Sequence, residues 1–363
     1  MNDRLKARSD ADRELAEYVS AHVGWHVSPW QIEACRQAGM IQEADHRYPG
    51  GGSSEANYSP VARQQAVEVA RLSKKYRKHD ELARVVFMRG LYVRPNALSA
   101  AFARPFDKML GLIGPLSSEK DKDRLGRFVL KIARYMLTTL YGKWMKSRLN
   151  GDRYGIPDLL YTVLHIYVTG QIPSDVGFEL MLKGSGLIGL YQHRMGELGP
   201  IAPDDNYEGL KSFLKQATLT AMRDRVSVAT LAELEEAREM TRLVIPFFRD
   251  FAVAVSKTSG QGRAFGLDLF GLIKLDELTL ANFVPMILFV MPWIKTEGGQ
   301  TVVAAMRSRA VAYRGMAELT ERVPEALMKR LVAGDASALS ELDPELQERV
   351  RSVARELAAT APS

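Results

Sequence analysis

Two helix starts separated by a glycine-rich stretch constrain the fold of this chain more than any other feature. Ser28-Pro29 and Ser59-Pro60 each place a hydroxyl side chain before a proline, an order typical of the beginning of an α-helix. Between these starts the helical pattern ends at Gly39, and a run of three glycines follows. The chain therefore makes a non-helical excursion here, and the nature of that excursion decides the N-terminal fold.

A helix-turn-helix is expected before the excursion. Residues 11–22 carry apolar side chains at helical spacing, and Gly24 closes them. The second helix is expected to begin at Pro29 and to end at Gly39. A glycine is favoured there because the residue that ends a helix often adopts a left-handed backbone conformation. Two short helices joined by a glycine turn have the outline of a helix-turn-helix, although such helical hairpins are also common in protein cores.

The excursion itself fits the two-stranded wing of a winged helix. Glycines at its tip permit the positive φ values that a hairpin turn uses. Ile41 and Tyr58 are expected to tie the wing to the core. Arg47 and Tyr48 are expected to lie on the wing, where an arginine reaches phosphate or the minor groove.

Further helices are expected after the wing. One is predicted from Pro60 through the basic segment that ends at Lys78, and the next stops at Gly90. Another begins near Pro95, and Pro105 is among the residues expected to mark the end of the N-terminal unit.

The segments VSPWQIEACRQAGMI and NYSPVARQQAVEVARL, with the expected wing between them, resemble the N-terminal DNA-binding domain of the MerR family. The resemblance covers roughly residues 12–75 and extends more loosely over residues 77–102. It implies a winged helix-turn-helix whose recognition helix enters the major groove and whose wing touches the flanking backbone. It also implies a transcription regulator that binds double-stranded DNA as a homodimer.

Carried over to this chain, the resemblance assigns a set of DNA-binding residues. The groove-side residues are Trp30, Gln31 and Arg36, and the residues of the wing and its base are Arg47, Tyr48 and Tyr58. The remaining residues expected at the DNA interface are Ser28, Arg63, Lys74 and Lys75. The basic run that contains the two lysines is also typical of a solvated helix face, and Trp30 also fits a buried core position.

The rest of the chain is expected to be all helical. Long apolar runs with helical period recur, and β-branched residues do not cluster in short alternating stretches, so no sheet is indicated. The predicted fold class is therefore all-α dominated. We expect a winged helix-turn-helix at residues 1–116, an all-helical dimerisation or effector-binding domain at 124–322, and an amphipathic helical tail at 323–363.

The positive charge belongs to the N-terminal part. Residues 1–150 hold 26 Lys and Arg against 16 Asp and Glu, whereas residues 151–363 hold 23 against 27. The single cysteine, Cys35, excludes an internal disulfide, and with six scattered histidines it forms no zinc-ligand spacing. We therefore expect no metal and no cofactor, and a reducing, cytoplasmic setting fits best.

One apolar run, residues 278–294, requires a choice between core and membrane. It is shorter than the roughly 20 residues that span a bilayer, and it contains Pro285 and Pro292. A buried core helix is expected, with a membrane-inserted or interfacial segment as the alternative. Its apolar side chains would suit a pocket for a small apolar effector or a large dimer interface.

Catalysis is not indicated. Gly184, Gly186 and Gly189 match the spacing of a dinucleotide-binding motif, but no strand is expected before them. Residues 258–266 form a glycine-containing stretch without the Lys of a phosphate-binding loop. His165 is expected to be a core or interface residue. The protein is therefore not expected to be an enzyme.

The sequence as a whole predicts a sequence-specific DNA-binding transcriptional regulator. Two alternatives remain. The first is an architectural or excisionase-like accessory factor, which uses a winged helix to bend DNA. The second is a helical interaction module that does not bind DNA, an interpretation favoured by the small positive charge of the recognition helix.

Overall fold

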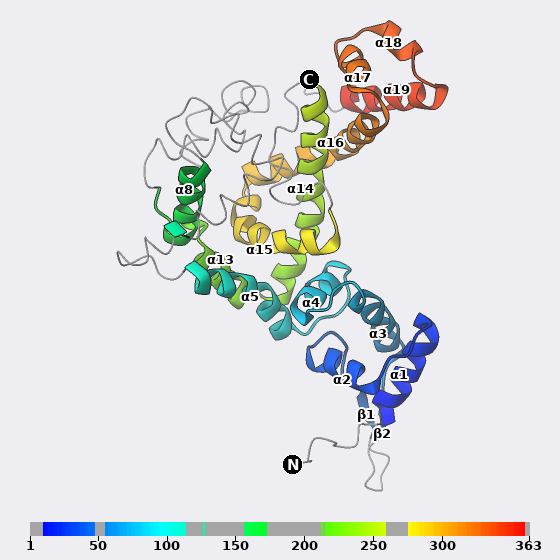
Figure 1. The fold of residues 1–363 in the computed structure, drawn as a ribbon, viewed down its shortest axis with the longest axis vertical. Helices are drawn as coiled ribbons and strands as arrows, with labels where there is room; N and C mark the ends of the chain where they lie inside the picture. Colours follow the sequence, from blue (N-terminus) through cyan, green and yellow to red (C-terminus); the bar gives the residue numbers. More distant parts are fainter. Residues whose placement is uncertain are drawn as a thin grey trace. The chain divides into compact units, whose positions relative to one another are not determined.

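The computed structural model describes residues 10–47, 55–113, 126–127, 156–172, 212, 215–258 and 275–359, with side chains of 45–47, 55–56 and 156–160 and a few others left out. The described chain is dominated by α-helices, as predicted (Figure 1). It divides into two compact units. Unit 1 comprises Met1–Asp107, Arg223–Arg238 and Asp276–Pro285, and unit 2 comprises Lys108–Met222, Glu239–Leu275 and Met286–Ser363.

Unit 1 is thus discontinuous in sequence, whereas we expected a continuous domain at residues 1–116. The expected boundary at residues 117–123 lies outside the described residues. The N-terminal elements of unit 1 are, in order, α1 (Asp10–Val23), α2 (Pro29–Gln37), β1 (Asp45–Arg47), β2 (Glu55–Asn57), α3 (Pro60–Ser73) and α4 (His79–Met88). They are followed by α5 (Pro95–Ile113), whose first part belongs to unit 1.

The ends of α2 are fixed by local chemistry. The hydroxyl of Ser28 accepts a hydrogen bond from the backbone N–H of Gln31, and Gln31 Oε1 accepts one from the backbone N–H of Ser28 at 2.8 Å. This reciprocal capping satisfies two donors that the first turn of a helix leaves unpaired. At the other end, Gly39 has φ +75°, as its predicted C-cap position requires.

The strands β1 and β2 form one antiparallel pair. Asp45 lies opposite Asn57, and Arg47 lies opposite Glu55. The residues between the strands, including the three glycines, lie outside the described part of the chain.

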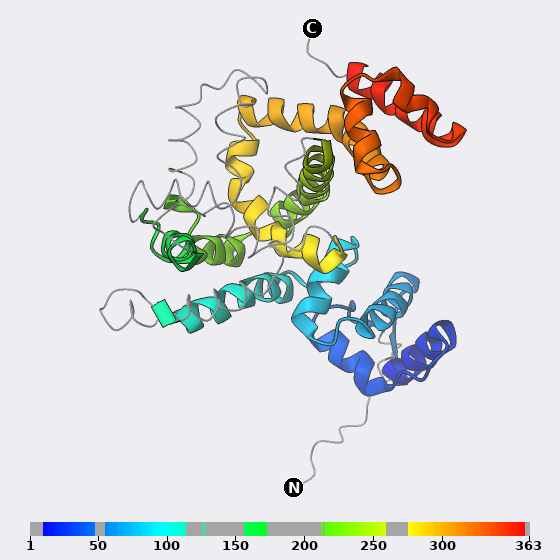
Figure 2. The same cartoon turned by 45° about the horizontal axis from the view of Figure 1, so that its top comes forward.

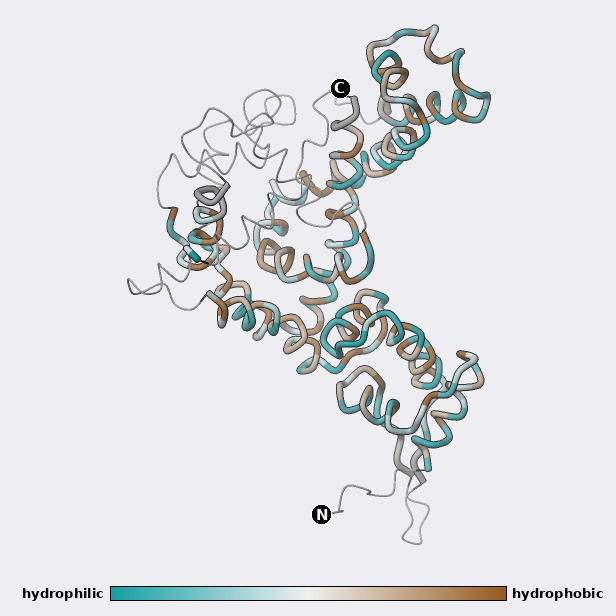
Figure 3. The backbone as a smooth tube through the Cα atoms, in the orientation of Figure 1, coloured by the Kyte–Doolittle hydropathy of each residue, from teal (hydrophilic) through white to brown (hydrophobic). Residues whose placement is uncertain are grey.

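The core of this part of unit 1 lies between α1, α2 and α3. Helix α1 packs against both α2 and α3, and Figure 1 and Figure 2 both place α1 beside α3. Ile41 and Tyr58, at the two feet of the hairpin, are 1% and 5% exposed, as predicted. Hydrophobic and hydrophilic positions alternate along these helices (Figure 3), because each buries one face. The buried cluster also includes Leu15, Val19, Ile32, Ala62, Ala66 and Val67.

One predicted helix end is wrong. Helix α3 ends at Ser73 and does not continue through Lys78. The backbone N–H groups of Lys75 and Tyr76 both bond to the carbonyl of Leu72, so the chain turns here, and the turn buries the Tyr76 ring to 4% exposure. Burial of this aromatic side chain outweighs the helix propensity of the basic residues around it.

Helix α5 runs through Pro105, one of the residues expected to mark the end of the N-terminal unit, and ends at Ile113. A proline inside a helix removes one backbone hydrogen bond. Burial of the preceding face offsets this loss: Leu98, Ala101 and Phe102 are each at most 2% exposed, as predicted for the buried face of this helix.

Two later segments complete unit 1. They come from α13 (Leu219–Val228), the first part of α14 (Leu231–Thr258) and the first part of α15 (Glu277–Ile294). Arg238 donates a hydrogen bond to the carbonyl of Phe87 at 3.1 Å, and its guanidinium lies 4.9 Å from the Phe87 ring. Arg84, 8% exposed, donates to Asn282 Oδ1. The later segments therefore contact α4 directly.

Helix α15 contains the apolar run singled out in the sequence. By length and composition alone it could cross a membrane, and 39% of its residues are buried within the structure. Ala281, Val284, Leu288 and Met291 are buried at helical spacing, so one face of α15 is covered by protein.

Unit 2 contains α8 (Ile156–Thr169), α16 (Glu297–Arg322), α17 (Glu325–Val332), α18 (Ala336–Ser340) and α19 (Pro344–Ala359). Helix α19 packs on α16, and at their closest approach a Cβ on Gly315 would lie 2.6 Å from Val353 Cγ2. In α8, the half-buried His165 stacks on Tyr161 with ring centroids 5.6 Å apart. The predicted helical tail, residues 323–363, includes α17 to α19, and α19 packs on α16.

Candidate nucleic-acid interface

The first turn of α2 presents Trp30 to solvent. Its side chain is 60% exposed, whereas that of Ile32, two residues later, is 2% exposed. Positions two residues apart lie on different sides of a helix, so burial of Ile32 in the core directs Trp30 outward. The alternative of a buried core position for Trp30 is therefore excluded.

Most of the polar side chains of α2 are tied to other residues of unit 1. Gln31 takes part in the capping interaction with Ser28, and Gln37 Nε2 donates to Glu33 Oε1 at 2.9 Å. Arg36 lies against Asp12, with 3.8 Å between Nε and Oδ1. Gln31 and Arg36, the two polar residues expected on the groove side, thus have structural partners within the protein.

Asp12 joins α1, α2 and the foot of the hairpin. Its carboxylate is 3% exposed, and it accepts a hydrogen bond from the Tyr58 hydroxyl at 2.6 Å. Burial and this hydrogen bond raise the pKa of Tyr58 well above its usual value. The Arg36 contact is too long for a hydrogen bond, so Arg36 acts on Asp12 mainly through its charge. Tyr58 therefore anchors the hairpin, and little of its side chain is left for a ligand.

Sequence reasoning did not single out Asp12, although a signal was present. Asp12 precedes Ala16 and Val19 by four and seven residues, and both are buried. A carboxylate on the apolar stripe of a helix indicates a buried polar partner. Tyr58 supplies that partner from a position 46 residues away in sequence.

The hairpin is described only through the backbone of its strands. Arg47 is the last residue of β1, and its side chain is outside the described part. Tyr48 lies wholly outside the described residues. The DNA-contacting roles expected for these two residues stay predictions.

Cations and aromatic rings meet along α1 and α3. Arg63 Nε donates to the carbonyl of Tyr58 at 3.2 Å, and the Arg63 guanidinium lies 5.8 Å from the Tyr18 ring. Lys74 Nζ lies 3.4 Å from the centre of the Trp25 ring, in the turn before α2. Such cation–π contacts hold the side chains in place without neutralising their positive charge. Arg63 and Lys74 therefore keep a charge that phosphate can use.

Lys75 has an acidic partner instead. Its Nζ lies 3.1 Å from Asp276 Oδ2, which also accepts the Tyr76 hydroxyl at 3.4 Å. The other carboxylate oxygen of Asp276 caps α15 by accepting from the N–H of Thr279 at 2.9 Å. Partial burial raises the pKa of Asp276, but the hydrogen bonds from Thr279 and Lys75 outweigh it and hold this pKa below its ordinary value.

A second acidic residue of the same helix pairs with Arg89. Arg89 Nη2 lies 2.8 Å from Glu277 Oε1, and Arg89 Nη1 lies 3.5 Å from Glu68. We call Asp276 and Glu277 the acidic pair of α15. No local sequence pattern indicates this pair, because it lies about 200 residues from the cations that it contacts.

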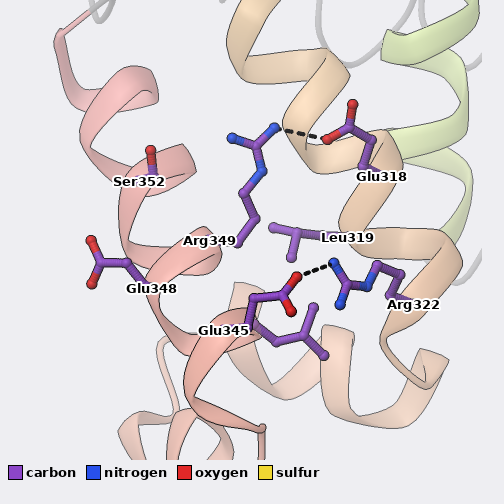
Figure 4. Close-up of a pocket in the computed structure, with 8 residues that line it drawn as sticks. Glu318, Leu319, Arg322, Glu345, Glu348, Arg349 and Ser352 are labelled. Carbon is purple, nitrogen blue, oxygen red and sulfur yellow. Dashed lines mark hydrogen bonds and ion pairs between the residues drawn. The ribbon is translucent and has the colours of Figure 1, made fainter.

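A groove of about 450 Å³ lies between α16 and α19 in unit 2 (Figure 4). Arg322 pairs with Glu345, and Arg349 pairs with Glu318, both at 2.8 Å. Figure 4 shows these two pairs bridging the helices on either side of Leu319. Four of the five charged residues that line the groove pair with one another across it, and the fifth, Glu348, pairs with Arg355.

No cluster of three His, Cys, Asp or Glu suited to a metal occurs among the residues the structure describes. Burial raises the pKa of the Cys35 thiol to about 11, so at neutral pH this thiol is protonated and unreactive. The glycine motif at Gly184, Gly186 and Gly189 lies outside the described residues. The exposed start of α2 is therefore the strongest candidate site.

No family model, curated protein or solved structure matches the chain. Its function is accordingly argued from its own residues.

Proposed function

We propose that the protein is a sequence-specific DNA-binding transcriptional regulator, with α2 in the major groove and the β1–β2 hairpin on the neighbouring backbone. The order of α1, α2, hairpin and α3 is that of a winged helix-turn-helix. In such motifs the N-terminal residues of the second helix contact base edges. The observation that carries the proposal is the capped start of α2, which holds Trp30 60% exposed at this position.

The surroundings of α2 support the same proposal. Asp12 links α1 to Tyr58 and Arg36, so helix and hairpin are held in one arrangement before any ligand arrives. Preorganisation of this kind lowers the cost of binding. Arg63 and Lys74 supply positive charge for phosphates, which position a protein on DNA without reading its sequence.

We further propose that the regulator is cytoplasmic and binds as a homodimer, each copy reading one half-site. Two-fold symmetric binding of this kind places recognition helices about one turn of DNA apart. An effector, if one binds, would belong to the helical domain beyond residue 123.

The test is selection of bound sequences from a random duplex library by the purified full chain at two salt concentrations. The wild type is compared with Lys74→Ala and Arg47→Ala, and Arg307→Ala on α16 is the charge-matched control. Arg36 is left unchanged, because its removal would leave the buried carboxylate of Asp12 without its cation. Enrichment of paired half-sites, weakened by the first two changes and by salt but not by the control, is the expected result.

One observation favours a second candidate, a helical interaction module that does not bind DNA. Several cations after the wing are paired with carboxylates inside unit 1, among them Lys75 with Asp276 and Arg89 with Glu277. Absence of retained duplex even at low salt would support this module and contradict the regulator. Retention without an enriched motif would instead identify an architectural DNA-binding factor.

A further inference from the structure

The chemistry of α2 limits what kind of base contact it can make. Gln31 Oε1 accepts from Ser28, Glu33 accepts from Gln37, and Arg36 is drawn towards the buried Asp12 by charge, with 3.8 Å between Nε and Oδ1. Hydrogen-bond readout of a base edge needs a polar side chain that is free to point at it. The hydrogen-bonding capacity that α2 can offer to DNA is therefore reduced.

Trp30 is the largest exposed side chain of α2. No hydrogen bond, ion pair or ring contact engages it within the part of the chain that the structure describes. It follows Pro29, whose fixed φ, together with the Ser28 cap, sets the direction in which the first turn leaves the core. An indole has only two side-chain torsions, so it loses little entropy when it is ordered at an interface.

An indole offers a broad apolar surface and a single N–H donor. Among the groups that base pairs present in the major groove, the C5-methyl of thymine is the apolar one. Contact between the indole and this methyl removes apolar surface of both partners from water. The apolar indole of Trp30 is therefore best suited to contact the methyl group of thymine.

We infer that Trp30 is a specificity-determining residue that recognises the C5-methyl group of thymine in the major groove. The inference rests on the proposed function and deepens it, because it names the base that the exposed start of α2 selects. The protein then reads its site partly through apolar contact, with the paired polar residues of α2 holding the helix in position.

The test compares thymine with deoxyuridine, which differs from it only by the missing methyl group. The wild-type full chain is titrated with its selected duplex, and then with duplexes in which one thymine at a time is replaced by deoxyuridine. Loss of the contact between one methyl group and the indole is expected to weaken binding by about three- to tenfold at one or two positions. Fluorescence anisotropy of labelled duplex gives the affinities.

Trp30→Ala is then measured on the same duplexes. We expect weaker binding to the thymine duplex and equal affinity for its deoxyuridine counterpart, because the side chain that senses the methyl is gone. Lys74→Ala is the matched control: it is expected to weaken both duplexes by the same factor. Trp30→Ser, which also lacks an apolar surface for the methyl, covers the case in which Trp30→Ala does not fold, as judged by circular dichroism.

Two results would overturn the inference while leaving the proposed function intact. One is sequence-specific binding by the wild type with no loss at any deoxyuridine position. The other is a Trp30→Ala or Trp30→Ser variant that discriminates thymine from deoxyuridine as strongly as the wild type does. Absence of an enriched sequence in the selection would instead overturn the proposed function and the inference together.

Discussion

Gly39 combines a left-handed backbone with a close approach of another helix. Its φ is +75°, its carbonyl accepts a hydrogen bond from the N–H of Arg94 at 2.7 Å, and a Cβ here would lie 2.8 Å from Arg94 Cβ. A side chain at Gly39 would therefore strain the backbone and also separate α2 from the start of α5.

We predict that Gly39→Ala destabilises the protein by about 2 kcal/mol or more, since backbone strain and steric overlap add. Gly24→Ala is the matched control, because Gly24 has φ +78° but nothing within 4 Å of its Cβ position. That change is expected to cost only about 1 kcal/mol. Urea unfolding of both variants measures the difference, and equal losses would show that contact with Arg94 contributes nothing.

At this scale the sequence predicts roles that depend on local geometry. Gly39 as a C-cap and Ile41 and Tyr58 as buried feet follow from spacing alone, and the structure confirms them. The partners of Tyr58 and Gly39 cannot be predicted from spacing, because the tertiary fold brings Asp12 to Tyr58 and Arg94 to Gly39. For Trp30 the sequence left two positions open, and only the packing of Ile32 decides between them.

Among the helices, α15 contacts the residues that follow α3 and α4 through its acidic pair. Asp276 uses one carboxylate oxygen to cap α15 and the other to accept from Lys75 and Tyr76. The same residue therefore starts a helix and neutralises a cation that the resemblance assigned to DNA. Because Lys75 and Asp276 are partly exposed, the ion pair contributes little stability, and its main effect is on the local charge.

We predict that Asp276→Asn strengthens binding to duplex DNA at low salt. The amide oxygen still caps α15, but Lys75 loses its counter-charge and becomes available to phosphate. The slope of affinity against salt concentration, on logarithmic axes, is expected to steepen by about one. Asp335→Asn, which removes a helix-capping charge in unit 2, is the control and should leave DNA affinity unchanged. An unchanged salt slope in Asp276→Asn would contradict a role of Lys75 at the interface.

The turn between α13 and α14 predicts a pH dependence of stability. The hydrogen bond from Arg225, followed by those from Thr230, lowers the pKa of Glu233 to about 2. A carboxyl whose pKa is lowered on folding stabilises the protein above its unfolded pKa of about 4.3 and loses this contribution as pH falls towards the folded value.

Between pH 6 and pH 3 the wild type should therefore lose more stability than Glu233→Gln. The side chain is 35% exposed, so solvent screening limits the expected difference to about 1 kcal/mol. Free energies of unfolding in urea at both pH values provide the measurement. Identical pH profiles for the two proteins would show that the Arg225 contact does not persist in solution.

Helix ends show where prediction from sequence stops. The starts of α2 and α3 follow from Ser-Pro pairs, whose chemistry is local, and the structure confirms both. The predicted end of α3 is wrong because Tyr76 is buried. Helix α5 continues through Pro105 because its apolar face is covered. Burial depends on segments distant in sequence, so a local pattern does not contain it.

On the scale of the molecule, unit 1 is assembled from three separate stretches of chain. The second stretch, residues 223–238, provides Arg238, which donates a hydrogen bond to the carbonyl of Phe87. The third stretch, residues 276–285, provides Asn282, which accepts a hydrogen bond from Arg84. Phe87 and Arg84 are 2% and 8% exposed. The sequence could not predict this arrangement, because the charged link at residues 117–123 has the composition of a domain boundary.

We predict that a fragment of residues 1–116 is less stable than unit 1 in the full chain. Removal of the two later segments exposes the α4 surface around Phe87 and leaves the buried guanidinium of Arg84 without Asn282. The urea midpoint of the fragment, followed by the fluorescence of Trp25 and Trp30, should fall below the corresponding transition of the full chain. Arg238→Ala in the full chain should give a smaller decrease, and a fragment with an unchanged midpoint would show that the later segments do not stabilise α4.

The three-part composition of unit 1 also has a consequence for its biosynthesis. A ribosome adds about 5–20 residues per second, so residues 108–285 take roughly 10 to 35 seconds to follow the first stretch. For most of this interval the first stretch of unit 1 has been made while the later segments that contact Phe87 and Arg84 are still missing. The nascent chain therefore lacks the cover of Phe87 until translation passes Arg238, and the partner of Arg84 until it passes Asn282. This is the period in which a chaperone has a surface to bind.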